Sequence, residues 1–290
     1  MDDIEIASSF FLTTAPVVSD ITTSGFTLSW NTNVMGNSNV NYGITTGLGT
    51  EVNEAAMTTS HNVTLTGLEP ATIYYVQVYS ESGSDIASSN TIVVSTASNS
   101  TGEMRIYFNA VVDDSFSSGA DPQAVTPAAM EAAIIDLIDN AQNTIDFAAF
   151  NINRTTIVQA LTEAHNRGVR VRYIRDDQTA NIALQNPTPP FTIIFGNIGD
   201  PLMHNKFIVV DADSQDDSWV VTGSTNFTEQ NIATDFNNTI FIQDQALARG
   251  YELEMNEMWG SDTATPDFLN LTFGEDKKDN TPHTLSLIHI

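Results

Sequence analysis

The chain has 290 residues, more than most single domains contain, and two domains are therefore expected. Its 36 acidic and 10 basic residues give a formal net charge of -26, which argues against broad electrostatic capture of nucleic acid or of an anionic membrane. The absence of cysteine excludes disulfides, thiolate metal sites and cysteine nucleophiles.

After an N-terminal tail of residues 1–14, residues 15–97 are predicted to form a β-sandwich. Alternating segments between turn residues predict its strands, at 26–30, 40–42, 62–65, 72–79 and 91–94. Trp30 on an early strand and the run Leu-Glu-Pro-Ala-Thr-Ile-Tyr-Tyr-Val at 68–76 resemble the fibronectin type III pattern, with Tyr74 at its tyrosine corner. This resemblance implies a spacer or a module for an extracellular ligand, and not a catalytic domain.

Beyond a polar linker at residues 98–103, strands alternate with helices. Strands are predicted at 105–108, 144–150, 169–174, 191–195, 206–210, 219–222 and 239–242. Apolar stripes through 134–141, 157–164 and 247–258 predict helices, and Gly168 is expected to end the second of them. Residues 104–262 are therefore predicted to form an α/β sandwich, followed by a connector and tail at residues 263–290.

Two arginines alternate along one predicted strand. Arg170 and Arg172 are two residues apart, so their side chains leave the same face. They either face a phosphate or form the solvent-exposed face of the strand, and the second interpretation is favoured.

The residues that indicate chemistry begin with His204 and Lys206. Being two apart on a strand, both side chains leave one face and are able to meet at one ligand. Asp211 is seven residues from His204, an odd offset that predicts the opposite face and a structural role. One face of the strand therefore offers an imidazole and a fixed cation.

A second group of polar residues follows on the next predicted strand. Gly223 permits close approach of a backbone, and Ser224 and Asn226 offer a hydroxyl and an amide from one face. These neutral donors suit the oxygen atoms of a phosphate. Together with His204 and Lys206, they indicate phosphodiester chemistry.

An imidazole is able to attack phosphorus, hold it as a phosphohistidine and release it to water without a metal. Cationic and amide groups would meanwhile stabilise the charge on the other phosphate oxygens. The leaving alkoxide needs a proton, so a second histidine must act as general acid and then as general base. The acidic segment 211–217 is interpreted as a solvated hairpin, because it lacks the glycine and the closing glutamate of a calcium loop. Neither a metal nor a cofactor is expected.

The pattern His204-x-Lys206, Asp211 and then the Gly-Ser-Thr-Asn run at 223–226 resembles the signature of the phospholipase D superfamily, and the resemblance extends over residues 104–260. It implies a catalytic set of His204 as nucleophile, Lys206 and a supporting Asp211. It also implies that Ser224 and Asn226 bind the substrate phosphate. Two features differ from the family pattern: eleven residues separate Asp211 from Gly223, and an Asn-Asn pair at 237–238 stands where some relatives have Glu-Asn.

Members of this superfamily build one site from two motif copies, whereas this sequence has one. The second copy is therefore expected from a homodimer partner or from a second half absent from this chain. Residues 274–283 resemble the connector that precedes such a half, and the tail at 285–290 resembles translated adapter sequence, which suggests truncation.

The predicted function is a metal-independent phosphodiesterase acting on phospholipid or nucleic acid. Two alternatives stay open: an endonuclease of the same superfamily, and an inert secreted adhesion or binding protein. The acidic, cysteine-free composition favours a secreted or cell-surface location, although the first residues show no signal peptide.

Overall fold

The computed structural model describes residues 9–110, 115, 123–124, 127–196 and 202–271. They divide into two compact units, and the division falls between Asn99 and Ser100, inside the polar segment 98–103. Most of the N-terminal tail and the connector and adapter-like tail of residues 274–290 lie outside the described residues. No helix in the described part of the chain is long and apolar enough to cross a membrane.

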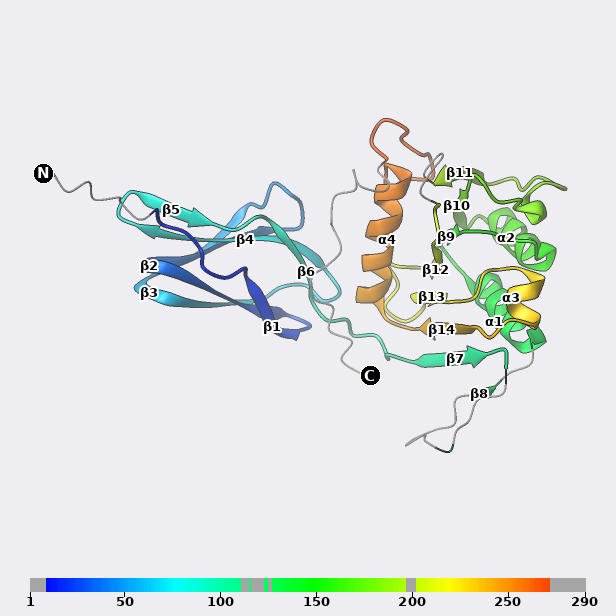
Figure 1. The fold of residues 1–290 in the computed structure, drawn as a ribbon, viewed down its shortest axis with the longest axis horizontal. Coiled ribbons are helices and arrows are strands. Elements are labelled where there is room, and N and C mark those ends of the chain that lie inside the picture. The colour runs from blue at the N-terminus through cyan, green and yellow to red at the C-terminus, as the bar shows by residue number, and fades with distance from the viewer. Residues whose placement is uncertain (1–8, 111–114, 116–122, 125–126, 197–201, 272–290) are drawn as a thin grey trace, which may run out of the picture. The chain divides into compact units, whose positions relative to one another are not determined.

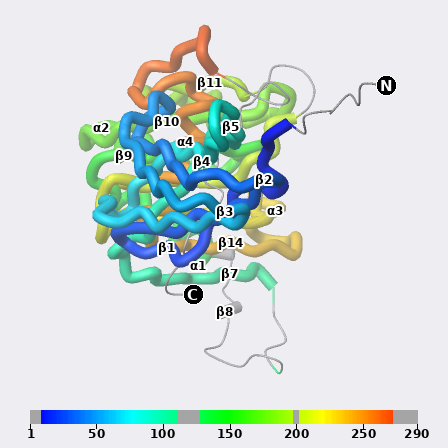
Figure 2. Tube along the Cα trace, turned by 90° about the vertical axis from the view of Figure 1, so that its left-hand side faces the viewer, coloured from blue at the N-terminus to red at the C-terminus, as the bar shows by residue number. Residues whose placement is uncertain are grey.

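The first unit is an antiparallel β-sandwich. Its strands are β1 (Val17–Thr22), β2 (Gly25–Gly43), β3 (Thr50–Thr66), β4 (Ile73–Ser82), β5 (Asp85–Ser88) and β6 (Ile92–Ser95). The first half of β2 pairs with β1 and β3, and its second half pairs with β3 and β4. Figure 2 shows β2 and β3 running side by side.

The two strands predicted at 26–30 and 40–42 are thus one strand. Its pairing with β3 shifts register between Asn31 and Ser38, which lets a single strand serve both halves of the sandwich. β1 is an additional strand that the sequence pattern did not predict.

The core of this unit contains the two aromatic residues singled out in the sequence. The hydroxyl oxygen of Tyr74 accepts a hydrogen bond of 3.0 Å from the backbone N–H of Glu69, as expected for a tyrosine corner. The indole Nε1 of Trp30 donates to Ser80 Oγ at 3.0 Å, and its ring stacks on His61 with 4.9 Å between centroids. His61 is buried, which lowers its pKa, and it has a packing role in the sandwich.

The second unit is built on one eight-stranded sheet. Its strands are β7 (Met104–Phe108), β8 (Gln123–Ala124), β9 (Thr144–Ala149), β10 (Arg170–Asp176), β11 (Thr192–Gly196), β12 (Lys206–Val210), β13 (Trp219–Gly223) and β14 (Asn238–Ile242). Their order in the sheet is β11-β10-β9-β12-β13-β14-β7-β8. β9, β10 and β11 are parallel, whereas β12, β13, β14 and β7 follow one another antiparallel.

Helices cover both faces of this sheet, as predicted for an α/β sandwich. Three of them, α1 (Pro127–Asn140), α2 (Thr155–Arg167) and the short α3 (Glu229–Ala233), lie on one face, and α4 (Gln245–Trp259) lies on the other (Figure 1). A 3-10 turn, η1, spans Ile182–Leu184. Gly168 ends α2 with a φ of 100°, as the sequence predicts.

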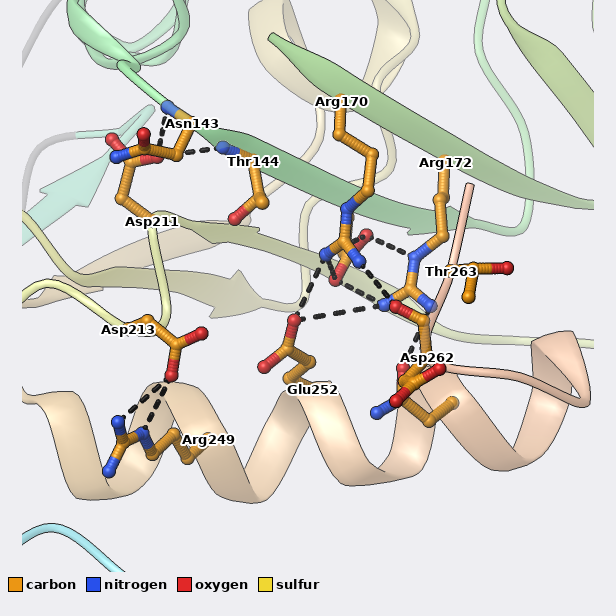
Figure 3. Close-up of polar contacts among 12 residues, drawn as sticks. Asn143, Thr144, Arg170, Arg172, Asp211, Asp213, Arg249, Glu252, Asp262 and Thr263 are labelled. Carbon is orange, nitrogen blue, oxygen red and sulfur yellow. Dashed lines mark hydrogen bonds and ion pairs between the residues drawn. The ribbon is translucent and has the colours of Figure 1, made fainter. Parts of the chain in front are cut away.

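Both interpretations of the two alternating arginines were wrong, because α4 covers the face they occupy (Figure 3). Arg172 is fully buried, and its Nε and Nη2 each donate at 2.6 Å to the carboxylate of Asp146, its neighbour on β9. Arg170 pairs with the same carboxylate at 3.2 Å and with Glu252 of α4 at 3.0 Å. The charges therefore join α4 to the sheet and are not available to a substrate.

Candidate active site

The candidate site lies at the end of the sheet where β12 begins. β12 is placed between β9 and β13 and is antiparallel to both, so β9 and β13 end where β12 starts. After β13 the chain forms a bridge between Phe227 and Ile152, just beyond β9. Because β12 lies between β13 and β9, the segment from the end of β13 to this bridge, which contains Asn226, has to cross the start of β12. His204 and Lys206 lie at this start.

His204 and Lys206 share one aromatic neighbour, as their spacing of two predicts. The ring of Phe150, which follows β9, lies edge-on to the imidazole with 4.6 Å between centroids. The ammonium Nζ of Lys206 lies 5.5 Å from the centroid of the same ring and donates a hydrogen bond of 3.0 Å to the backbone carbonyl of His204. Neither ring nitrogen of His204 is hydrogen-bonded to a described residue.

The surroundings of His204 favour the neutral imidazole. Partial burial and the positive charge of Lys206 lower its pKa, while the carboxylate of Asp176 acts in the opposite direction. Burial also lowers the pKa of the Lys206 ammonium. An imidazole with a lowered pKa has a free lone pair at neutral pH, which is the form able to attack phosphorus.

Gly223 ends β13 where two backbones come close together. Its φ is 144°, and a Cβ at this position would lie 2.3 Å from the carbonyl oxygen of Asn238 on β14. The next residue, Ser224, donates its hydroxyl proton to Asn237 Oδ1 at 3.0 Å and accepts from the N–H of Asn238 at 3.1 Å. The Ser224 hydroxyl is able to donate to a phosphate only if its hydrogen bond to Asn237 Oδ1 breaks.

Asn226 is held by an asparagine that carries no motif signal in the sequence. The backbone N–H and the side-chain Nδ2 of Asn226 both donate to Asn231 Oδ1 on α3, at 3.1 and 2.8 Å. Asn231 in turn donates to Asp235 Oδ2 at 2.8 Å. One N–H of the Asn226 amide remains for a phosphate oxygen. Because α3 has only five residues, it is too short to show an apolar stripe in the sequence. Sequence reasoning therefore missed both this helix and Asn231.

Asp211 lies at the opposite end of β12 from His204. Its buried carboxylate accepts three backbone hydrogen bonds, at 2.7 Å from Gln142, 2.7 Å from Asn143 and 2.8 Å from Thr144. Figure 3 shows the bonds from Asn143 and Thr144. These contacts fix the start of β9 to the end of β12. They give Asp211 a supporting role, as its odd spacing indicates, and place it away from the imidazole with which the family resemblance groups it.

The acidic loop after Asp211 makes contacts of its own. Asp213 accepts from Arg249 of α4 at 2.9 Å (Figure 3), and Asp217 accepts from the Ser214 hydroxyl at 3.0 Å. Within the described ranges, no group of three or more His, Asp or Glu side chains is arranged to hold a metal ion.

Comparison with known proteins assigns a relationship to each unit. Residues 134–259 match the family described as cardiolipin synthase, PLD-like domain. Residues 16–96 match the family described as the purple acid phosphatase N-terminal domain, close to the span of 15–97 for which a fibronectin type III resemblance is noted above.

Individual relatives resemble the second unit. Mitochondrial cardiolipin hydrolase of Xenopus tropicalis is 29% identical over 136 residues, which are 46% of this chain and 62% of the relative. A phospholipase D of Rickettsia felis is 31% identical over 128 residues, 43% of this chain and 62% of that protein. The chain thus spans about six-tenths of the length of these curated relatives. The crystal structure of Nuc from Salmonella typhimurium, a phospholipase D family member, gives a TM-score of 0.42 at 21% identity, covering 54% of this chain and 93% of that chain.

Proposed function

We propose that this chain, in which a fibronectin type III-like β-sandwich precedes a phospholipase D-like domain, hydrolyses phosphodiester bonds with His204 as its nucleophile. One observation carries the proposal: at one end of the sheet lie an ammonium group, a held amide and an imidazole whose pKa is lowered and whose ring nitrogens are hydrogen-bonded to no described residue. No other end or face in the described part of the chain combines these three groups.

The reaction would proceed in two displacements. A ring nitrogen of His204 attacks phosphorus, an N–P bond forms, and the P–O bond to the leaving alcohol breaks. Lys206 and the free N–H of Asn226 stabilise the charge on the remaining phosphate oxygens. Water then attacks phosphorus and loses a proton to the group that acted as general acid in the first step, the N–P bond breaks and the imidazole is regenerated.

The proton for the leaving alkoxide must come from another group. Among the described histidines, His61 is buried in the other unit. His165 lies near the end of α2, against Phe191, and α2 runs away from the site because it begins after β9 and ends before β10. We therefore propose that the general acid is supplied by a homodimer partner or by a second catalytic half.

For the substrate, we favour a phospholipid or another small phosphodiester over a nucleic acid. The chain has a net charge of -26, and five of its described arginines are already in ion pairs, namely Arg105, Arg154, Arg170, Arg172 and Arg249. Lys206 then offers a local positive charge without the wide basic surface that binds a nucleic acid backbone.

The β-sandwich would serve as a spacer or as a module for an extracellular ligand in a secreted or surface protein. Its described residues form a buried apolar core, and they include no combination of imidazole, ammonium and amide groups like the one at the start of β12.

The test uses bis(4-nitrophenyl) phosphate, because 4-nitrophenolate leaves without needing a proton. With chelator present, the chain should release about one nitrophenolate per molecule in an initial burst. His204→Gln should abolish the burst, and the matched control His165→Gln should retain it. A burst in His204→Gln, or no burst from the folded wild-type chain, overturns the proposal, and the second result favours an inert binding protein.

The substrate class is decided by a second comparison. Short-chain phosphatidylcholine should be cleaved faster than plasmid DNA under the same conditions, with light scattering recording whether the active species is a dimer. Faster cleavage of the plasmid would favour the endonuclease.

A further inference from the structure

A buried carboxylate at the end of β10 has no part in the mechanism described above. Asp176 is the last residue of this strand and has an exposed fraction of 0%. Its Oδ1 accepts hydrogen bonds from the backbone N–H groups of Gln178 at 2.9 Å and Thr179 at 3.0 Å. Its Oδ2 accepts from the backbone N–H of Met203 at 3.0 Å, the residue immediately before His204.

The segment leading into His204 is also held by packing. The side chain of Met203 is buried, and a Cβ at Gly196 of β11 would lie 2.6 Å from Met203 Cγ and 3.1 Å from Ile174 Cγ2. The missing side chain of Gly196 thus makes room for Met203. One hydrogen bond and one enclosed side chain therefore fix the backbone that carries the nucleophile.

The charge of Asp176 also reaches the imidazole. Among the described residues, two charged groups act on His204: Lys206 from β12, which lowers its pKa, and Asp176 from β10, which raises it. A carboxylate shielded from water is poorly screened, so its influence extends further than that of an exposed acid.

We propose that Asp176 is the positioning residue for His204, and that its carboxylate stabilises the positive charge that the imidazole gains when it is phosphorylated. An imidazole that keeps a proton on one nitrogen and forms a bond to phosphorus with the other becomes a cation. The positive charge of Lys206 destabilises that cation, and the negative charge of Asp176 counteracts this effect. The second half of this proposal rests on the proposed function, whereas the first half does not.

An asparagine cannot replace this carboxylate. Asp176 accepts on both oxygens, and an amide has one acceptor oxygen and one donor nitrogen. In Asp176→Asn, the nitrogen faces either the N–H of Met203 or the N–H groups of Gln178 and Thr179. The substitution therefore removes the charge and at least one of the bonds that hold the segment.

The chain offers a matched control at the other end of β12. Asp211 is also buried and also accepts three backbone N–H bonds, but it is not among the groups that act on His204. Asp211→Asn therefore removes the same kind of support without changing the field at the imidazole.

The decisive measurement is the NMR titration of the His204 ring in the wild-type chain, Asp176→Asn and Asp211→Asn, with the resonance assigned by its loss in His204→Gln. The midpoint should move to lower pH in Asp176→Asn and stay at the wild-type value in Asp211→Asn. An unchanged midpoint in Asp176→Asn, or an equal change in both variants, overturns the proposal. Because no substrate is used, this result is independent of whether the chain is a phosphodiesterase.

The rate of the nitrophenolate burst supplies the second readout. It should fall by about tenfold to a hundredfold in Asp176→Asn, because the nucleophile is displaced and its cation is less stable. If Asp176→Asn does not fold, Gly196→Ala takes its place, since it displaces Met203 and keeps the carboxylate. A burst rate in Gly196→Ala within twofold of wild type would then contradict the positioning role.

Discussion

The ammonium group of Lys206 donates a hydrogen bond of 3.0 Å to the backbone carbonyl oxygen of His204, so the cation of the site is tied to the residue that carries the nucleophile. Both side chains also contact Phe150. A change at Lys206 should therefore affect the charge at the phosphate and the titration of the imidazole together.

Lys206→Met keeps the apolar stem and removes the cation. The nitrophenolate burst should slow by about a hundredfold or more, because a fixed charge facing the developing negative charge is lost. The acid limb of its pH profile should move to higher pH, because Lys206 lowers the pKa of His204. A slower burst with an unmoved acid limb would contradict the pairing of the two residues.

The pH dependence of the wild-type chain follows from the same balance. Partial burial and Lys206 lower the pKa of His204 from its ordinary value of 6.5. The attacking form is neutral, so kcat/KM should fall on acidification only below about pH 6.5. Stopped-flow measurement of the burst between about pH 4 and 8 checks this, and an acid limb above pH 7 would disagree with it.

Asn231 should matter to the rate although it does not reach the substrate. Asn231→Leu removes the acceptor for two N–H groups of Asn226, so the amide loses its fixed direction. The burst rate should fall about tenfold. Gln230→Ala on the exposed face of α3 is the control and should react at the wild-type rate. Equal rates for the two variants would show that Asn226 needs no such support.

Gly223→Ala should destabilise the second unit by about 2–4 kcal/mol, because a methyl group meets the Asn238 carbonyl while φ is positive. Gly168→Ala is the matched control: its φ is 100° and nothing lies within 4 Å of the added Cβ, so only the backbone penalty of about 1 kcal/mol applies. Guanidinium unfolding followed by Trp219 and Trp259 fluorescence compares them. Equal losses would argue against the close approach at Gly223.

Salt should speed up capture of a small anionic diester. The chain has a net charge of -26, which repels the substrate over a Debye length of about 30 Å at low salt and about 8 Å at physiological salt. The value of kcat/KM should therefore rise across this range. A steep fall with salt, as expected for a surface that binds many phosphates, would instead support a nuclease.

Much of the second unit could be predicted because most of its longer elements have a local signal. Short stretches of sequence are enough to predict the buried strands, the apolar stripes of α2 and α4 and the end of α2 at Gly168. The burial of Arg172 could not be predicted in this way. It depends on Asp146 in the neighbouring strand and on α4, which comes much later in the chain. The same holds for β2, whose two predicted halves join through pairing with partners on both sides.

In the candidate site, too, the motif residues could be predicted and the residues that support them could not. The spacing of His204 and Lys206 predicts their common face, and the odd offset of Asp211 predicts its different surroundings. The residues that hold this set in place, Asp176 and Asn231, carry no motif. Asp176 acts through the backbone N–H of Met203, and Asn231 acts through the side chain of Asn226. Such contacts depend on the assembled fold and leave no pattern in the sequence.

The central claim, that His204 takes the phosphoryl group covalently, is tested most directly by trapping the adduct. Wild-type chain mixed with bis(4-nitrophenyl) phosphate and quenched in alkali should gain the mass of one nitrophenyl-phosphoryl group. Peptide mapping should place this group on His204, and the gain should be absent in His204→Gln. Nitrophenolate release without any adduct, or an adduct on another residue, would contradict the account.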